Sequence, residues 1–316
     1  MTRYRDRYEE IYNLLSRAEL QKGSEGLAEI AAGPELFGHD RERWLGFYTD
    51  QGLRTALEKY GFFRDLERLG LSQFRIETRT DDPDEHLFRL WSDEPSLDDP
   101  LVELVVRRDF LRPQSELADQ IPETHLPVLT VDWLLLQNPA RPFRPDRPPL
   151  PGQRHPGLGV GAQVLEMLRN ICKRLDLAAI VTVPSYFHNA FFYSTEFRHF
   201  DPHFQGAFLA LCRDLMPQVN NSVTHISWAL NWEMVANSDD PDEPYGWFQQ
   251  LMVNPLSDPL RDYFDHRLYR SQVQKSLQSH SFRLFESPLL QRLKAKGIHP
   301  FDPHKVATWI GDVTAS

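Results

Sequence analysis

The first third of the chain changes from helical to strand periodicity. Apolar residues recur every three or four positions over residues 4–15 and again over 53–69, and this spacing predicts two amphipathic helices. Between residues 74 and 79 apolar and charged residues alternate strictly, which is typical of a half-buried strand. The acidic turn at 81–84 separates that segment from residues 87–91, so the two segments are predicted to form an antiparallel hairpin.

Two more strands are predicted at residues 101–107 and 128–136. The second is almost continuously apolar, as a central strand buried on both faces should be. Seven prolines follow between Pro139 and Pro156. Proline cannot donate a hydrogen bond to a strand ladder, so this stretch predicts irregular chain. A domain linker is one interpretation, but the position between a strand and a helix favours a long connecting loop.

The remaining pattern predicts an amphipathic helix, a buried strand and then mostly helix. The segments are 164–175 (helix), 177–183 (strand), 189–196 (helix), and candidate helices at 208–215, 259–279 and 288–296. Together the segments predict an α/β chain of α+β character, with a mixed, largely antiparallel sheet flanked by helices. Three parts are expected: helices over 1–70, a core over 71–204 and a mostly helical extension over 205–316. Phe200–His203 recurs as Phe301–His304, which we interpret as a similar turn and not as an internal repeat.

Composition narrows the class of protein without identifying a function. Hydrophobic residues make up 41% and charged residues 25%, the usage of an ordinary globular protein. The net charge of −10 argues against a broad nucleic-acid-binding surface. The longest apolar runs, such as Leu177–Val183, are too short for a membrane helix, so no membrane partner is expected. The charged N-terminus, without an apolar stretch, and the two cysteines favour a reduced cytoplasmic setting.

The most informative segment is a glycine-rich turn, Pro151–Ala162, between a buried strand and an amphipathic helix. Glycines let the backbone turn sharply, and exposed N–H groups at a helix start can bind an anion such as a phosphate. A plain turn that only starts a helix is one interpretation. A dinucleotide-binding turn is a second, although the spacing here is G-x-G-x-G and the connection from the strand is long. A Walker loop is excluded, because no Gly-Lys-Ser/Thr run is present.

A third interpretation comes from the segment after the turn. The strand Ala179–Val183 leads into a helical segment with Asn189, Tyr193 and Phe197. Taken together, residues 128–197 resemble the acyl-CoA-binding half of the GNAT acyltransferase superfamily. That family has Q/R-x-x-G-x-G/A at a helix start, then a strand and a helix with Asn, a small residue and Tyr. The resemblance implies a GNAT-type fold and acetyl-CoA or another acyl-CoA as co-substrate, without a metal.

The resemblance also assigns the coenzyme's binding residues. The first motif matches as Arg154-x-x-Gly157-x-Gly159, while a second register makes Gly159-Val160-Gly161 the diphosphate turn and leaves Pro156 where Gln or Arg is usual. The strand Trp133–Gln137 would part from Ile180–Val183, and the pantetheine arm would pair with main-chain groups in that gap. The implied cofactor-binding residues are Leu135, Leu136, Gln137, Arg154, Gly157, Leu158, Gly159, Val160, Gly161, Ala162 and Asn189.

Acyl transfer from a thioester to an amine needs a base for the amine and an acid for the departing thiolate. By the resemblance Tyr193 is the candidate acid, although it could simply pack on its helix. Asp132 is the candidate base if partial burial raises its pKa, and a structural partner for an arginine is the equal alternative. Glu103 is a second candidate base. His188 could act as a base or contact the coenzyme, but a plain helix start with Asn189 as its cap is favoured.

The other residues of reactive type predict neither a metal site nor a nucleophile. His199 and His203 have H-x-x-x-H spacing, but Pro202 lies between them and no adjoining Glu completes a zinc motif, so no metal is predicted. Cys172 lies in the middle of a predicted helix with no base beside it, so we interpret it as a small buried hydrophobe and not as a nucleophile.

The acceptor cannot be identified from the sequence beyond a small-molecule or lysine-type amine, which the net negative charge favours. The aromatic residues Trp228, Trp232, Tyr245, Trp247 and Phe248 either line an acceptor pocket or, by the favoured interpretation, form the core of the C-terminal part. A different class of function is a GNAT-like scaffold without catalysis that senses CoA or binds a partner. The substitutions at Pro156 and Glu196 favour that alternative. No oligomeric state is predicted.

Overall fold

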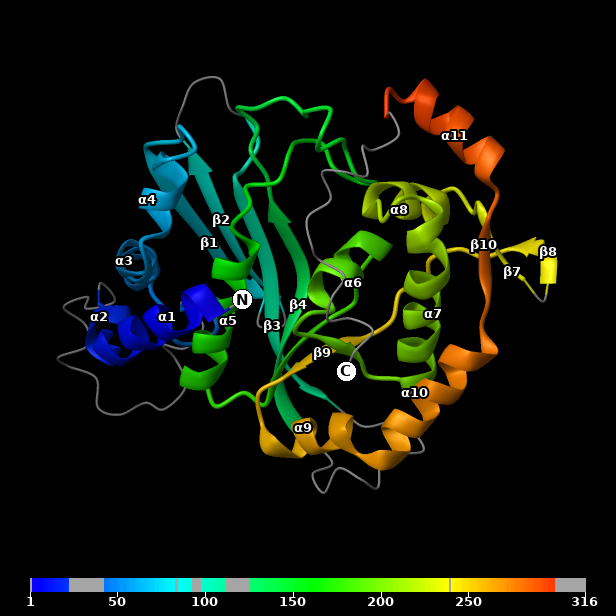
Figure 1. Ribbon diagram of the computed structural model, residues 1–316. Helices are drawn as coiled ribbons and strands as arrows, with labels where there is room; N and C mark the ends of the chain where they lie inside the picture. Colours follow the sequence, from blue (N-terminus) through cyan, green and yellow to red (C-terminus); the bar gives the residue numbers. More distant parts are fainter. Residues whose placement is uncertain are drawn as a thin grey trace. The chain divides into compact units, whose positions relative to one another are not determined.

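The alternating segments of the sequence form a seven-stranded sheet in the order β1-β2-β3-β4-β5-β9-β6 (Figure 1). The computed structural model describes residues 2–22, 43–82, 85–92, 98–111, 125–238 and 240–298. The strands of this sheet are β1 (Phe74–Asp82), β2 (Glu85–Ser92), β3 (Val102–Leu111), β4 (Leu126–Leu136), β5 (Ala179–Thr182), β6 (Arg198–His199) and β9 (Met252–Pro255). The predicted class, a mixed and mostly antiparallel sheet flanked by helices, is confirmed.

The register of the first strands follows the predicted hairpin. In the antiparallel pair of β1 and β2, Phe74 lies opposite Ser92, and Thr78 lies opposite Phe88. β2 also pairs antiparallel with β3, which places Phe88 opposite Leu104. Because side chains alternate along a strand, this register puts Phe88 and Leu104 together on the buried face.

The chain divides into two compact units that interleave along the sequence. The first unit contains residues 1–110, 127–142 and 155–180, and the second contains 111–126, 143–154 and 181–316. The three parts expected at 1–70, 71–204 and 205–316 remain a prediction.

The first unit packs its N-terminal helices on the helix that follows the glycine turn. Its helices are α1 (Thr2–Leu14), α2 (Arg17–Leu20), α3 (Asp50–Tyr60), α4 (Phe62–Glu67) and α5 (Gly161–Arg174). Asn170 of α5 donates to the carbonyl oxygen of Tyr8 at 3.2 Å and to the hydroxyl of Tyr60 at 3.1 Å. These bonds join α1 and α3 to α5 (Figure 1) and fix the orientation of α5 within this unit.

The prediction of one continuous helix over residues 53–69 is wrong. The segment forms two helices, α3 and α4, because Gly61 adopts the left-handed conformation with φ 76° and caps the end of α3. Its N–H bonds back to Glu58, which is how a glycine ends a helix while the apolar pattern continues beyond it.

The second unit contains more strand than its sequence suggested. Its helices are α6 (Phe187–Tyr193), α7 (Pro202–Gln218), α8 (Val223–Asn231), α9 (Asp258–Asp265), α10 (Arg267–Ser279) and α11 (Glu286–Ala295). The strands β7 (Val235–Asn237), β8 (Asp240–Pro244) and β10 (Phe282–Leu284) form a three-stranded sheet in the order β10-β7-β8. The helix predicted over 259–279 is interrupted at His266, whose ψ of 141° is extended and ends α9.

Two further predictions are compared with the described residues, one on membrane helices and one on the repeated tetrapeptide. In the described part of the chain, no helix is both long and apolar enough to cross a bilayer. The second copy of the repeated tetrapeptide, Phe301–His304, lies outside the described residues.

Candidate functional site

The glycine turn before α5 is anchored by two apolar side chains and exposes its glycines. Leu158 and Val160 are buried, with 5% of each residue's surface accessible. Gly157, Gly159 and Gly161 alternate with them and are exposed. Gly159 has a φ of 76°, a left-handed conformation that favours glycine. The alternation therefore holds the backbone of the turn against the core while its glycine face points outward.

The N–H groups on that exposed face have no acceptor in the part of the chain that the structure describes. Leu158 N donates to Leu136 O at 3.3 Å, and the first helical bond runs from Val164 N to Val160 O at 3.1 Å. Between them, the N–H groups of residues 159–162 meet no acceptor among the described residues. Val160, the N-cap of α5, supplies no capping side-chain bond either.

This arrangement is electrostatically suited to an anion. The left-handed residue Gly159 and the following Val160 (φ −105°, ψ 13°) turn successive N–H groups toward one concave side, the geometry of an anion-binding nest. The 14-residue α5 adds its dipole, equivalent to about half a positive charge at the N-terminus. The geometry favours the Gly159-Val160-Gly161 register, because Gly157 instead lies beside Gln137 in a β-bridge.

The strand before the turn, β4, is much longer than its neighbour β5. β4 has eleven residues and β5 has four. Ala178 N donates to Pro127 O at 2.7 Å, so β5 begins beside the first residues of β4. At about 3.3 Å per residue, four residues extend along less than half of β4. The last residues of β4, from Trp133 onward, therefore continue beyond the length of β5.

Hydrogen bonds show which way the main chain faces at the end of β4. Gln137 N donates to Leu101 O at 3.0 Å, so the main chain of Gln137 faces β3. Asn138 N donates to Pro156 O at 2.7 Å, so the main chain next to Gln137 faces residues 156–158 instead. Leu136 O already accepts from Leu158 N. The chain at the end of β4 is therefore hydrogen-bonded to Leu101 on one side and to residues 156–158 on the other.

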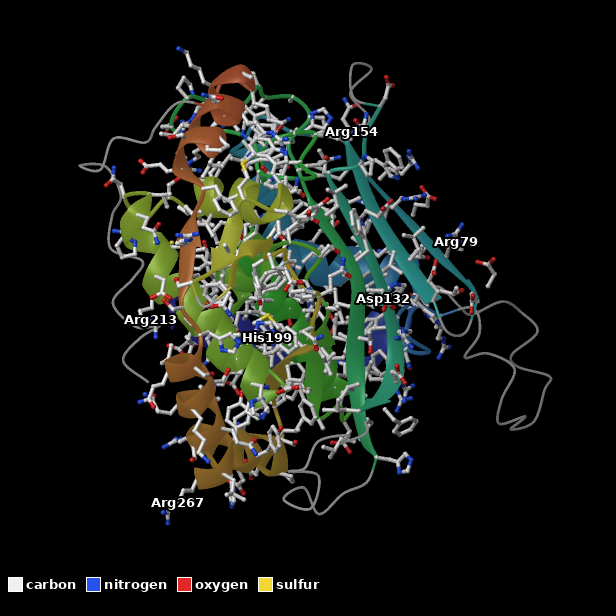
Figure 2. The ribbon with its side chains drawn as sticks, turned by 90° about the vertical axis from the view of Figure 1, so that its right-hand side faces the viewer. Arg79, Asp132, Arg154, His199, Arg213 and Arg267 are labelled. Atoms are coloured by element: carbon white, nitrogen blue, oxygen red, sulfur yellow. The ribbon has the colours of Figure 1, made fainter. Side chains whose placement is uncertain are left out.

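The two candidate bases of the first unit are arginine partners. Asp132, labelled on β4 in Figure 2, accepts from Arg107 Nε at 3.0 Å, and 41% of its side chain is exposed. The partial burial assumed for a base with a raised pKa is not found. Glu103 accepts from Arg89 Nε at 2.6 Å. Both carboxylates therefore have the structural arginine partner that was the alternative to a catalytic role.

In the second unit, α6 carries two of the predicted residues on one face. Asn189 and Tyr193 are four positions apart, so their side chains lie above one another on the helix. Both are half-buried, and no described residue bonds the Asn189 amide or the Tyr193 hydroxyl. Burial raises the pKa of Tyr193, so its hydroxyl stays protonated at neutral pH. The predicted cap was wrong, because Tyr186 is the N-cap and Asn189 lies inside α6.

Three other predicted residues have different surroundings. Arg154 is exposed and belongs to the second unit, whereas residues 155–162 of the glycine turn belong to the first. Cys172 is completely buried in the first unit, and burial raises the pKa of its thiol, as expected of a small core residue. His188 is 4% exposed, and burial lowers its pKa to about 4, so it is neutral at pH 7 and a poor base there.

The histidine pair of the second unit does not converge on one point. His199 is 1% exposed and packs against the rings of Phe208 and Trp247, whereas His203 is exposed. Figure 2 shows His199 among interior side chains, while Arg213 extends from α7 at the periphery. Within the described residues no group of three or more His, Cys, Asp or Glu side chains could hold a metal ion.

The buried histidines predict a pH-dependent stability. Burial lowers the pKa of both His188 and His199 to about 4, whereas in the unfolded chain it is about 6.5. Between these values only the unfolded state binds the protons. Each histidine should therefore remove about 1.4 kcal/mol of unfolding free energy per pH unit as the pH falls from 6.5 toward 4.

The measurement is urea unfolding between pH 7 and pH 5. His199→Phe should be tolerated, because neither ring nitrogen of His199 has a partner among the described residues. The two histidines together contribute to the slope of unfolding free energy against pH. We expect the His199→Phe variant to lose about half of that contribution. An unchanged slope would show that His199 is protonated in the folded protein.

Comparisons with known proteins leave the family open. No family model matches the chain, and no curated protein matches its sequence. Among solved structures, one described as "AtaT complexed with acetyl-methionyl-tRNAfMet" is similar with a TM-score of 0.26 and 13% identity, covering 39% of this chain and 85% of that chain. A similarity of this size carries no argument about activity or partners.

Proposed function

We propose that this protein transfers an acyl group from an acyl-CoA, such as acetyl-CoA, directly to an amine. The observation that carries the proposal is the exposed turn at residues 159–162, whose N–H groups have no acceptor among the described residues. The diphosphate of CoA is an anion suited to such a nest. The end of β4, which continues beyond the length of β5, supports a place for the pantetheine arm.

The side chains beside that strand suit an apolar arm. Trp133 of β4 is 46% exposed although its ring is large and apolar. A ligand that covers this ring removes apolar surface from water, which stabilises the complex by about 25 cal/mol per Å². Binding at the turn and along β4 would hold the thioester in place for attack by the amine.

The proposed step needs one proton donor. The amine nitrogen attacks the thioester carbon, the C–N bond forms, and the C–S bond breaks when the tetrahedral intermediate collapses. Tyr193 gives its hydroxyl proton to the departing sulfur, and the amine loses its proton to solvent or to a base. Burial keeps the Tyr193 hydroxyl protonated, so it can donate at neutral pH.

The direct test has two readouts on the same protein. Melting temperature in the presence of acetyl-CoA, longer acyl-CoAs, NAD and ATP reports which coenzyme binds. Release of free CoA from acetyl-CoA with a panel of amines reports turnover. The proposal predicts stabilisation by CoA species and amine-dependent release of CoA. Stabilisation by NAD with none by any CoA species would contradict it.

Replacement of Tyr193 by phenylalanine should slow turnover without preventing binding. General acids typically contribute about 10²–10⁴-fold, but a thiol with a pKa near 8.5 leaves without full protonation, so we expect a loss of about tenfold in kcat. Tyr12→Phe on α1 is the matched control, because it removes the hydroxyl of another half-buried tyrosine. Equal rates for Tyr193→Phe and wild type would remove Tyr193 from the mechanism.

One observation favours a second function, a CoA sensor without turnover. Asp132 and Glu103 are both paired with arginines, so neither of these carboxylates is a ready base. A sensor would show the CoA-dependent rise in melting temperature and no release of CoA with any amine. The two assays above therefore separate the two functions.

A further inference from the structure

The second unit contains a cavity that is lined by none of the predicted catalytic or cofactor-binding residues. Its volume is about 190 Å³, well above the roughly 10–15 Å³ that one water needs on the same measure. It lies between the start of α6, the end of α8 and the segment before β9. The polar and aromatic residues that line it are Ser185, Tyr186, Ser227, Asn231, Glu233 and Trp247.

The floor of the cavity has an unsatisfied polar group. Ser227 is 2% exposed, and its hydroxyl meets no partner in the described part of the chain. A buried hydroxyl without a partner costs about 1–3 kcal/mol, so a ligand that bonds to it regains that energy. Ser227, Leu230 and Asn231 are spaced i, i+3 and i+4 on α8, which places all three on the face that lines the cavity.

The mouth of the cavity holds a carboxylate in an unusual backbone conformation. Glu233 has a φ of 56°, the left-handed region that a non-glycine residue rarely adopts and that is often found at functional sites. No described residue forms an ion pair or side-chain hydrogen bond with its carboxylate. Across from it, a Cβ on Gly246 would lie 4.0 Å from Glu233 Oε1, so the absence of a side chain there leaves the space open.

The walls of the cavity are aromatic and fixed. Trp247 Nε1 donates to Pro184 O at 2.9 Å, and its ring packs edge-on against Phe187 at 5.7 Å between centroids. The ring of Tyr186 is held on one side by Gly152, where an added Cβ would lie 2.7 Å away. Aromatic faces attract ammonium groups, and none of the lining residues is Lys, Arg or His.

We infer that this cavity binds the ammonium group of a small organic amine, which, if the proposed acyl transfer holds, is the acceptor substrate. Glu233 pairs with the charge, the ring of Trp247 contacts it, and Ser227 accepts a hydrogen bond from it. An anion is disfavoured by Glu233. A divalent metal is disfavoured because the cavity offers one carboxylate, whereas such ions take several oxygen ligands in a closed shell. The two alternatives for the aromatic residues of the second unit therefore both occur. Trp247 lines the cavity, whereas Trp228 lies in the core and is 7% exposed.

The test measures amine binding without any coenzyme. The probe is n-butylamine, protonated at neutral pH, and the comparison is n-butanol, which is similar in size but uncharged. Calorimetry gives the affinity, and the indole N–H signal of Trp247, assigned by its loss in Trp247→Phe, reports the place. We expect n-butylamine to shift this signal and to bind at least about tenfold more tightly than n-butanol, because one charge pair is worth about one such factor.

Two variants and one control locate the site. Glu233→Gln keeps the shape of the side chain but removes its charge. It should raise the Kd for n-butylamine about tenfold. Gly246→Val keeps the charge but fills the space, and should reduce binding as strongly. Asp262→Asn, an exposed acidic residue of α9 that does not line the cavity, should change nothing. Equal binding of amine and alcohol, equal losses in Glu233→Gln and Asp262→Asn, displacement of the amine by Mg²⁺ or Ca²⁺, or no shift of Trp247 would each overturn the inference.

Failure of this inference and failure of the proposed function give different results. If CoA is released with amines but Glu233→Gln has the wild-type KM for every amine, the acceptor lies elsewhere and acyl transfer stands. If n-butylamine binds as described but no CoA species raises the melting temperature, the cavity stands and acyl transfer does not.

Discussion

Gly159→Val should abolish the stabilisation of the protein by CoA. A Cβ at Gly159 meets no protein atom within 4 Å, so the valine side chain would occupy the open space on the exposed side of the turn, where we propose that the diphosphate binds. In addition, a β-branched residue is a poor fit at a φ of 76°, and relaxation of that angle would turn the N–H groups away. A ligand at a hundred times its Kd raises the free energy of unfolding by about 2.7 kcal/mol, and we expect the Gly159→Val variant to lose this increment.

A matched control separates loss of the nest from general strain. Gly70 has a φ of 86°, is exposed, and also has no atom within 4 Å of an added Cβ. Gly70→Val therefore imposes the same kind of backbone strain, about 1–2 kcal/mol, at a position outside the turn. It should lower the melting temperature of the free protein to a similar extent but keep the full CoA response. Loss of that response in both variants would contradict the role of the turn.

Gly206→Ala should produce the largest loss of stability. Gly206 lies where α7 crosses α10, and a Cβ there would come within 2.5 Å of both the Cβ of Ser276 and the carbonyl oxygen of Val273. The second contact is with backbone, so the helices must separate. Their separation would stretch the bond from Ser276 Oγ to His203 O, now 2.6 Å.

Overpacking of this kind costs about 1–3 kcal/mol or more, and the better helix propensity of alanine returns about 1 kcal/mol. Because the overlap is with backbone, we take the upper end of that range and expect a net loss of about 2 kcal/mol in the second unit. The measurement is urea unfolding followed by the midpoint of the transition. Gly246→Ala is the control, because its Cβ meets only ordinary contacts at 3.8 Å and beyond. Equal midpoints for the two variants would show that α7 and α10 are not in close contact.

The sheet of the first unit was predictable because its strands carry their own pattern. Alternation over residues 74–79 and continuous apolar sequence over 128–136 are local signals, and burial of one or both faces produces them. β9 (Met252–Pro255) has no such pattern, since a four-residue strand ending in proline becomes a strand only by pairing with its neighbours. The break at Gly61 had a local signal, a glycine within a helical pattern, whereas the break at His266 had none.

The candidate site was predictable at the level of the turn but not of single atoms. Glycines before an amphipathic helix indicate an anion-binding turn, and the described residues offer the N–H groups there no acceptor. The direction of the Gln137 main chain is fixed by its bond to Leu101 O, which no sequence pattern encodes. The pairing of Asp132 with Arg107 and the position of Glu233 beside Gly246 likewise depend on tertiary packing.

The most direct test of the central claim is the amide spectrum of protein labelled with ¹⁵N-glycine. Sixteen glycine signals are expected, and substitution of single glycines assigns those of Gly159 and Gly161. If the exposed turn binds the diphosphate, CoA should move both amide protons downfield, whereas pantetheine, which lacks the diphosphate, should leave them in place. Binding of CoA with both signals unchanged, or an equal shift with pantetheine, would contradict a diphosphate site at this turn.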